Sequence, residues 1–426
     1  MFFFFFSLPL KALSINPKTM KRNLLLLFFA GFLFASSGLH GKTPKTVFVI
    51  LDGIPADMIE RLNPPTIQEI AGNGGYCRAY CGGTVGRYDQ TPTISAVGYA
   101  CVLTSTWANK HNVWDNAPKP NYSYPSIFRI AKDQKKDFKT ALYSSWTDNR
   151  TVLLGENLPE TDSLTIDYVV DGLDLDTDKY PKEKDDLHIF RIDEAVSKAA
   201  AEGIRNDAPD LSWVYLWYTD DAGHIYGNSD FFDRYTLLAD KQVERIWEAV
   251  KYREANFDEE WLVIITTDHG RGPDGYNHGG QSERERTCWI STNVKPNSHF
   301  AEPCLSIVDI NPTICRYMGF KLPDHTLWEQ DGVPFIGQTD IAGIETTRND
   351  NSITLKWQSL NDQASATIYV SKTNRFNQGS TDEWIKVGKV KAGTEEFVYD
   401  ISEDPESFYK FAVVTRNNHL TCWSPK

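Results

Sequence analysis

The sequence predicts an α/β fold in which a mostly parallel sheet is flanked by helices, with a small all-β sandwich at the C-terminus. Between Thr46 and about Ile336, strand-like apolar runs alternate with helix-like stretches, which is typical of a parallel sheet covered on both faces. After Gly337 only strand-like runs follow. The chain has 426 residues, too many for one compact core, so we expect two domains.

The elements of the first region follow from two periodicities. Short runs rich in β-branched and aromatic residues predict strands, and apolar residues that recur every three or four positions predict helices. The expected strands are Thr46–Leu51, Thr140–Tyr143, Leu211–Trp217, Trp261–Thr266 and Thr287–Ile290. The expected helices are Pro65–Gly72, Ser95–Leu103, Ser126–Lys132, Ile192–Gly203, Phe231–Arg253 and Ile307–Met318.

Residues 345–426 are expected to form the second domain. Apolar and polar residues alternate in runs such as Ile353–Trp357 and Tyr409–Val413, and turn residues separate these runs. About 80 residues of this pattern predict a small β-sandwich. The Leu-x-Trp run followed by a late Tyr-x-Phe-x-Val strand resembles a fibronectin type III module.

The N-terminus, residues 1–41, has the features of a signal peptide. Lys21-Arg22 form a basic region, Leu24–Phe34 form an apolar stretch too short for a comfortable membrane span, and Ala35–Gly38 supply small residues for cleavage. Met20 is a more natural start than Met1, because an apolar Phe run otherwise precedes the basic region. We therefore expect a periplasmic or secreted protein with no transmembrane anchor after cleavage.

Charge and cysteine content exclude some classes of function. The formal net charge is −13 and no long Lys/Arg run occurs, which argues against binding to a nucleic-acid polymer, although nucleotides remain possible small substrates. Seven scattered cysteines do not make a disulfide framework. Whether Cys77 and Cys81 pair is left open. The Asp-rich segment 171–186 lacks the Gly and Glu of a calcium loop and is predicted to be a solvated loop.

Three late segments carry residues that bind metals. Asp220 and His224, which one helical turn or a tight loop puts on the same face, follow the predicted strand Leu211–Trp217. Asp268 and His269 directly follow the next predicted strand.

The third segment places His278 among glycines, where the backbone can approach a ligand closely. The first strand also ends in a carboxylate, Asp52. Carboxylate and imidazole suit zinc, and the carboxyl ends of strands in an open α/β sheet are where ligands bind. The sequence therefore predicts a metal-dependent active site, with two metals favoured over one.

A candidate nucleophile lies in the segment Thr91–Tyr99. Ser95 begins the predicted helix, and a helix N-terminus offers free N–H groups and a positive dipole end that suit a phosphate. A serine hydroxyl needs a base or a metal to become a good nucleophile. Considered alone, Ser95 is interpreted as an N-cap residue. Thr93 is the next candidate nucleophile.

The ordered set of motifs resembles the alkaline phosphatase superfamily, and within it the type I phosphodiesterase/nucleotide pyrophosphatase branch. The motifs are Asp52-Gly53, a Pro-Thr-x-Ser helix start, Asp-x-x-Gly-His, Asp-His-Gly and a later His-Gly. The stretch Asp309–Ile314 also resembles an Asp-x-x-Pro-Thr helix start near the end of that fold. The resemblance covers roughly residues 44–337 and implies an alkaline-phosphatase-like catalytic domain at 42–340.

The resemblance implies roles for seven residues and two Zn²⁺ cofactors. Asp220, His224 and His278 would bind one zinc. Asp52, Asp268 and His269 would bind the other, together with Ser95 as nucleophile. The implied reaction is hydrolysis of a small phosphate ester through a covalent phosphoserine. Two inversions at phosphorus would give net retention.

Departures from the family pattern bear on the ester class. Many nucleotide pyrophosphatases carry Thr as nucleophile and Asn three residues later, where this chain has Ser95 and Gly98. Secreted zinc phosphomonoesterases of the same superfamily have Gly there and an Asn about twenty residues on, which Asn116 matches. Their phosphate-binding Lys-Asp-Arg segment corresponds to a stretch that keeps Arg150 but lacks the Lys.

Asn116 and Arg150 are therefore the candidate substrate-binding residues, with a turn residue and a solvated cation as their alternative interpretations. A dianionic monoester needs more positive charge than a diester, so the missing Lys favours a phosphodiesterase/nucleotide pyrophosphatase. The alternatives are an alkaline phosphomonoesterase and a phosphoalcohol transferase of the same superfamily. A non-enzymatic scaffold with an adhesive β-domain is disfavoured, because all the expected ligands are present. A sulfatase is disfavoured because its Cys/Ser-x-Pro-x-Arg motif is missing from the mature sequence.

Overall fold

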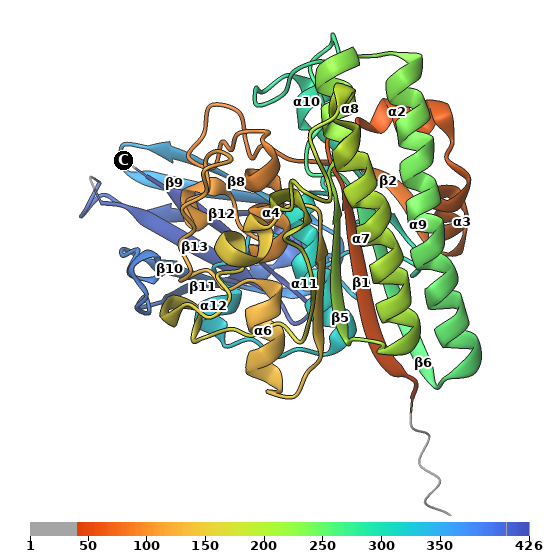
Figure 1. Cartoon of the computed structure of the whole chain (residues 1–426). Coiled ribbons are helices and arrows are strands. Elements are labelled where there is room, and N and C mark those ends of the chain that lie inside the picture. The colour runs from red at the N-terminus through yellow and green to blue at the C-terminus, as the bar shows by residue number, and fades with distance from the viewer. Residues whose placement is uncertain (1–40, 406, 426) are drawn as a thin grey trace, which may run out of the picture. The chain divides into compact units, whose positions relative to one another are not determined.

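The computed structural model describes residues 41–405 and 407–425, and the residues from Pro44 onward pack as one unit. A seven-stranded sheet has the order β2-β7-β6-β1-β5-β3-β4, and Figure 1 labels its strands β1, β2, β5 and β6. Its strands are β1 Thr43–Leu51, β2 Gly75–Tyr80, β3 Thr140–Ser144, β4 Tyr168–Val170, β5 Leu211–Leu216, β6 Glu259–Thr266 and β7 Thr287–Thr292. Strand β1 pairs with β5, β5 with β3, and β3 with β4, all in parallel, whereas β7 is antiparallel to β6 and β2. The predicted mostly parallel sheet is confirmed.

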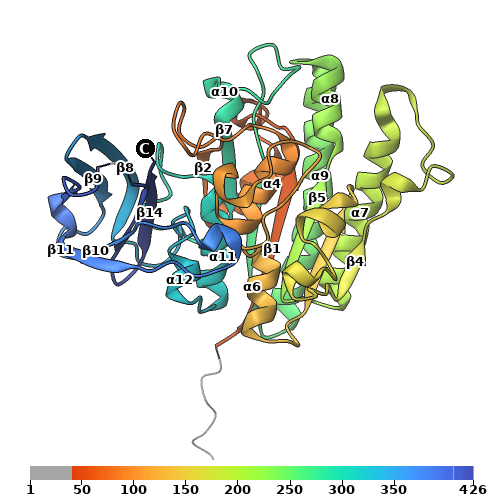
Figure 2. The ribbon, with the colours of Figure 1, turned by 90° about the vertical axis from the view of Figure 1, so that its left-hand side faces the viewer.

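Helices cover both faces of this sheet, as the predicted α/β fold requires (Figure 2). One face carries α2 Ala56–Leu62, α3 Pro65–Asn73, α7 Leu187–Asn206 and α9 Asp230–Asn256; the other carries α4 Ser95–Thr104, α6 Ile127–Gln134 and α11 Ile310–Met318. Shorter helices are α5 Ala108–His111, α8 Tyr218–Tyr226, α10 Glu283–Arg286 and α12 Asp324–Leu327. In β1, Phe48 and Ile50 join one core, and Val47, Val49 and Leu51 join the other. The second half of this strand, residues 47–51, is entirely apolar because both of its faces are buried.

Irregular helical turns and some unpredicted elements complete the domain. The turns cover Asn149–Leu153, Pro159–Thr161, Leu173–Leu175, Lys184–Asp186 and Ile307–Asp309. Every predicted strand and helix is present, with ends shifted by a few residues. The sequence did not predict β2, β4 or the helices α2, α5, α10 and α12, and at α8 it left one helical turn or a tight loop open. Strands β2 and β4 are short edge strands whose side chains are mostly half-buried, so they lack the apolar run that identifies a buried strand.

The C-terminal region confirms the predicted small all-β sandwich. Its strands are β8 Ile341–Asn349, β9 Ser352–Ser359, β10 Ser365–Ser371, β11 Ile385–Lys391, β12 Glu396–Asp400, β13 Tyr409–Val414 and β14 His419–Ser424, with helical turns at Phe376–Gln378 and Ala392–Thr394. They form a four-stranded sheet β11-β10-β13-β14 and a three-stranded sheet β12-β9-β8. Inward-facing residues such as Leu355, Trp357 and Phe411 share one core. The fibronectin type III identity and the limits 42–340 and 345–426 stay predictions.

Two further expectations concern the N-terminal signal peptide and the pairing of Cys77 with Cys81. The predicted signal peptide lies outside the described residues, apart from Gly41. Within residues 41–405 and 407–425, no helix combines the length and hydropathy that crossing a bilayer would demand. Cys77 and Cys81 are free thiols. Cys77 lies within β2 and Cys81 directly follows it, and four residues of extended chain span about 13 Å, too far for a disulfide.

A buried ion cluster joins the sandwich to the α/β layers. Lys410 on β13 is fully buried, and its Nζ lies 2.6 Å from Asp382 Oδ2 and also bonds to Glu329. Lys110 on α5, likewise buried, donates to the main-chain oxygen of Glu329 at 2.8 Å. Removing one partner from such a cluster leaves an uncompensated buried charge.

We therefore predict that Lys410→Met lowers the free energy of unfolding by about 3–5 kcal/mol, because Asp382 and Glu329 lose their shared cation. Denaturant-induced unfolding measures the change. Lys356→Met is the control, since Lys356 is 63% exposed in its ion pair with Glu396 and its loss should change the free energy by less than about 0.5 kcal/mol. Equal unfolding midpoints for the two variants would contradict a stabilising cluster.

Candidate active site

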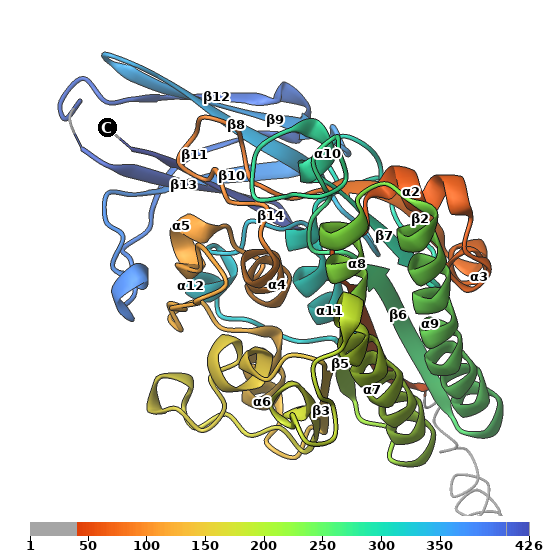
Figure 3. The same cartoon turned by 45° about the horizontal axis from the view of Figure 1, so that its top comes forward.

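The predicted metal ligands converge because their strands are neighbours in the sheet. Asp52 follows β1, Asp268 and His269 follow β6, and Asp220 lies in α8, which begins just after β5. The sheet order β6-β1-β5 puts these strand ends side by side. Figure 3 shows α4, α8 and α10 gathered around this end of the sheet. The carboxyl end of an open α/β sheet is where such folds bind ligands.

Asp52, Asp268 and His269 form a fully enclosed group. Asp52 Oδ2 accepts hydrogen bonds from the hydroxyls of Tyr99 and Tyr215, the latter at 2.6 Å. Asp268 Oδ1 accepts the Gly53 N–H at 3.0 Å. The other two oxygens, Asp52 Oδ1 and Asp268 Oδ2, are buried and have no hydrogen-bond partner among the described residues. They lie 3.5 and 3.3 Å from His269 Nε2, so three atoms that can bind a metal lie close together.

Asp220, His224 and His278 form the second group. His224 Nε2 lies 3.3 Å from Asp220 Oδ2 and 3.0 Å from His278 Nε2. His278 Nε2 lies 3.6 Å from Asp220 Oδ1. This group is the open one, since the His224 side chain is 40% exposed. The rings of His269 and His278 stack with centroids 3.8 Å apart, which makes the two groups adjacent.

Hydrogen bonds at the far ring nitrogens prepare two of the imidazoles for metal binding. His269 Nδ1 lies 2.8 Å from the Gly270 carbonyl, and His278 Nδ1 lies 2.8 Å from the Thr93 carbonyl. A carbonyl accepts but cannot donate, so we assign the proton to Nδ1 and the lone pair to Nε2 in both rings. Burial also lowers the pKa of His269 and of His278, which keeps both rings neutral.

The surroundings shift the pKa values of the three carboxylates in different directions. Burial, with the nearby charges of Asp268 and Asp220, raises the pKa of Asp52 well above its usual range. Burial, with the charge of Asp220, raises the pKa of Asp268 to about 8. Burial opposes ionisation of Asp220 as well, but the Arg271 guanidinium and His224 hold the pKa of Asp220 well below its usual range. The enclosed group therefore lacks a compensating cation of its own.

Ser95 is the first residue of α4, and its Oγ lies 3.3 Å from His269 Nε2. The interpretation of Ser95 as an N-cap is wrong, because Ile94 occupies the N-cap position of α4. The Ser95 hydroxyl is thus available at the enclosed group. Gly98, one turn on, faces Asp268 so closely that a Cβ there would lie 2.6 Å from the Asp268 carbonyl oxygen. Close packing of α4 against the end of β6 explains Gly98.

The structure places the remaining candidates in different settings. Asn116 is exposed, and its Oδ1 accepts the Ala96 N–H at 3.0 Å, which fixes its amide beside the N-terminus of α4. The Arg150 guanidinium forms ion pairs with Asp171 Oδ2 at 2.6 Å and Glu156 Oε2 at 2.8 Å.

Thr93 supports the loop that carries His278. Its Oγ1 donates to the Gly280 carbonyl at 2.9 Å and accepts the Gly279 N–H at 3.0 Å. The Asp-rich segment 171–186 forms no metal group; among the described residues, only the two groups above have suitably clustered metal-binding side chains.

Sequence reasoning missed three residues that shape the site, namely Tyr99, Tyr215 and Arg271. All three are fully buried or nearly so and bond directly to a predicted ligand. Tyr99 lies four residues after Ser95, one helical turn on, and Arg271 directly follows Asp-His-Gly. These positions were the available signals. They were overlooked because an isolated tyrosine or arginine resembles an ordinary core or surface residue.

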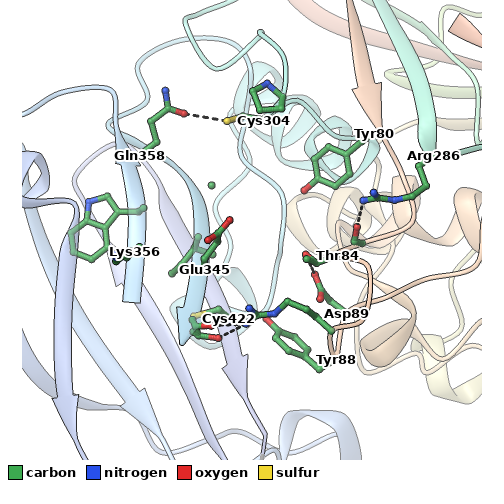
Figure 4. Close-up of a pocket in the computed structure, with 17 residues that line it drawn as sticks. Tyr80, Thr84, Tyr88, Asp89, Arg286, Cys304, Glu345, Lys356, Gln358 and Cys422 are labelled. Atoms are coloured by element: carbon green, nitrogen blue, oxygen red, sulfur yellow. Dashed lines mark hydrogen bonds between the residues drawn. The ribbon is translucent and has the colours of Figure 1, made fainter. Parts of the chain in front are cut away.

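A separate cavity of about 710 Å³ lies between the α/β layers and the sandwich (Figure 4). Thr84 and Arg286 line one wall, and Glu345 and Gln358 line the other. None of the nine predicted site residues borders it. The donor atoms that converge at Ser95, rather than this cavity, define the candidate active site.

A comparison with protein families gives a direct result. The family model described as type I phosphodiesterase / nucleotide pyrophosphatase matches residues 46–279, more than half of the chain. The chain belongs to the type I phosphodiesterase/nucleotide pyrophosphatase family. It is accordingly a hydrolase acting on phosphoric esters, in a family that typically depends on metals. A comparison with curated protein sequences gave no match.

Solved structures of several enzymes are similar to this phosphodiesterase-family chain. A putative sulfatase from Bacteroides thetaiotaomicron shares 12% identity over 85% of this chain and 86% of its own, with a TM-score of 0.46. Murine ectonucleotide pyrophosphatase/phosphodiesterase 5 shares 12% identity over 66% of this chain and 96% of its own, with a TM-score of 0.45. Phosphonoacetate hydrolase from Sinorhizobium meliloti shares 15% identity over 54% of this chain and 57% of its own, with a TM-score of 0.38. At such low scores, these likenesses add nothing to the assignment of function.

We predict that Gly98→Ala lowers the rate of phosphate-ester hydrolysis by about 100-fold, because the new Cβ forces α4 and Ser95 away from Asp268. Rates on a chromogenic phosphate ester measure the effect. In a helix interior, Ala is otherwise about 1 kcal/mol more favourable than Gly, so lower thermal stability of the variant would confirm the steric clash. A variant with the wild-type rate would show that this close approach does not position Ser95.

Proposed function

We propose that this protein is an exported, zinc-dependent phosphodiesterase/nucleotide pyrophosphatase that acts on small phosphate esters through a phosphoserine at Ser95. One observation carries the proposal. Two unpartnered buried carboxylate oxygens, from Asp52 and Asp268, converge with His269 Nε2 beside the Ser95 hydroxyl. Export to the periplasm or the exterior rests on the N-terminal sequence pattern alone.

The side chains of both groups fit zinc. Each group offers imidazole nitrogen and carboxylate oxygen, the donor set that zinc accepts, and three protein ligands leave a position open for substrate. Asp52, Asp268 and His269 would hold one ion, and Asp220, His224 and His278 would hold the other. When bound, two zinc ions would supply positive charge that favours the Ser95 alkoxide and stabilises the attacking and leaving oxygens.

The chain's own residues account for the other requirements of the reaction. Ser95 Oγ loses its proton and forms a bond to phosphorus as the bond from phosphorus to the leaving alkoxide breaks. The alkoxide takes up a proton and leaves as the alcohol, and a phosphoserine remains. Water then attacks phosphorus, the Ser95 Oγ–P bond breaks, and one proton of the water returns to the serine oxygen. Ser95 begins α4, and a helix N-terminus favours an anion such as a phosphoryl group. Asn116 is held beside this terminus because its Oδ1 accepts the Ala96 N–H.

The environment of Arg150 supports diesters over monoesters. Two carboxylates, Asp171 and Glu156, already offset its charge. With the corresponding Lys missing as well, the chain offers little extra positive charge for a dianionic phosphoryl group. A phosphomonoesterase and a phosphoalcohol transferase are the alternatives, the latter because an alcohol can take the place of water.

We predict that Asp268→Ala reduces the zinc content from two ions per chain to about one, because the enclosed group loses the oxygen that lies 3.3 Å from His269. Elemental analysis of the purified protein gives the stoichiometry. Asp240→Ala is the matched control, since Asp240 is an equally buried carboxylate that accepts N–H groups of Thr66 and Ile67. An unchanged metal content in Asp268→Ala would refute the ligand assignment.

We also predict faster hydrolysis of bis-p-nitrophenyl phosphate than of p-nitrophenyl phosphate, and a loss of roughly 1,000-fold or more in Ser95→Ala. Initial rates on both substrates, with and without an added alcohol, measure ester class and transfer together. A faster monoester rate would favour the phosphomonoesterase, and phosphorylation of the alcohol would favour the transferase. Full activity in Ser95→Ala would exclude the phosphoserine at this position.

A further inference from the structure

Arg271 is an unusually placed arginine. Its side chain is completely buried, although arginine is almost never buried unless it is paired. Nε donates to the Gly53 carbonyl at 2.9 Å, and Nη1 donates to the Tyr276 carbonyl at 3.0 Å. Nη2 donates to the main-chain oxygen of Asp220 at 2.6 Å and also to the Asp220 carboxylate oxygen Oδ1.

These acceptors all belong to segments that carry predicted metal ligands. Gly53 directly follows Asp52, and Tyr276 lies two residues before His278. One planar guanidinium therefore connects the end of β1, the start of α8 and the loop after β6. Its rigid fork of donors suits this task, whereas a flexible ammonium would make fewer bonds at fixed angles.

Two glycines of the recognised motifs make room for this guanidinium. A Cβ at Gly223, in the Asp-x-x-Gly-His motif, would overlap Cζ and Nε of Arg271. A Cβ at Gly53 would lie 2.9 Å from Arg271 Nη2 and 2.6 Å from Asp220 Oδ1. The backbone at both positions is thus shaped around the contact between Arg271 and Asp220.

We infer that Arg271 is a positioning residue that fixes Asp220 as a one-oxygen zinc ligand, an inference that rests on the proposed two-zinc function. By occupying Oδ1, Arg271 leaves Oδ2 facing His224 Nε2 at 3.3 Å. Partners of this kind orient the ligands of metal sites, and their loss typically weakens metal binding about 10- to 100-fold.

The test uses two variants of the full-length mature protein with Zn²⁺ alone as the probe. Arg271→Met removes the guanidinium, and Gly223→Ala displaces it without removing it. Chelator competition measures the affinity of each of the two Zn²⁺ ions, and circular dichroism reports folding. In both variants we expect one Zn²⁺ to bind about 10- to 100-fold more weakly.

Matched controls separate this role from general stability. Arg253→Met removes another buried arginine, which pairs with Glu259 and bonds to the Arg205 carbonyl. Gly72→Ala changes a helical glycine with open space around it. Both controls should bind two Zn²⁺ with wild-type affinity.

The outcomes distinguish this inference from the proposed function. Unchanged or tighter zinc binding in Gly223→Ala would overturn the inference while leaving a two-zinc enzyme intact. Should Arg271→Met fail to fold, Gly223→Ala alone decides the question. A wild-type protein that binds no Zn²⁺ would overturn the proposed function and the inference together.

Discussion

The burial of three carboxylates at one end of the sheet is the constraint on which the site depends. Asp52, Asp220 and Asp268 are all buried, and like charges in such surroundings resist ionisation. The fold assigns each a different partner: two phenols for Asp52, the Gly53 N–H for Asp268 and the Arg271 guanidinium for Asp220. Asp52 and Asp268 each keep one oxygen without a hydrogen-bond partner in the described part of the chain, and Asp220 keeps Oδ2 facing His224. Buried carboxylate oxygens without a partner cost free energy, which supports the proposed binding of cations between the carboxylates.

Space for these contacts comes from glycine. Gly98 admits the end of β6 against α4, while Gly53 and Gly223 admit Arg271 beside Asp220. The three glycines lie within or beside the segments that define the family resemblance. Each glycine affects the chemistry through packing, because a methyl group at any of the three positions would displace a residue of the site.

The two groups differ in access as well as in charge. The group of Asp52, Asp268 and His269 is buried. In the group of Asp220, His224 and His278, the His224 side chain is 40% exposed. In the proposed mechanism, the enclosed group would protect the nucleophile from bulk water, and the exposed group would admit the substrate and the water that completes hydrolysis. The proposed order of events, serine first and water second, agrees with this asymmetry.

The sequence by itself determined the α/β architecture, the sandwich and seven of the ligand and nucleophile candidates, because apolar periodicity and short polar motifs at strand ends are local signals. It left open whether Ser95 is a helix cap or a nucleophile, and the substrate-binding role of Arg150 stays a prediction. Only the tertiary structure decided that Tyr99, Tyr215 and Arg271 support the carboxylates. Their partners lie 47, 163 and 51 residues away, and such contacts leave no mark on local sequence.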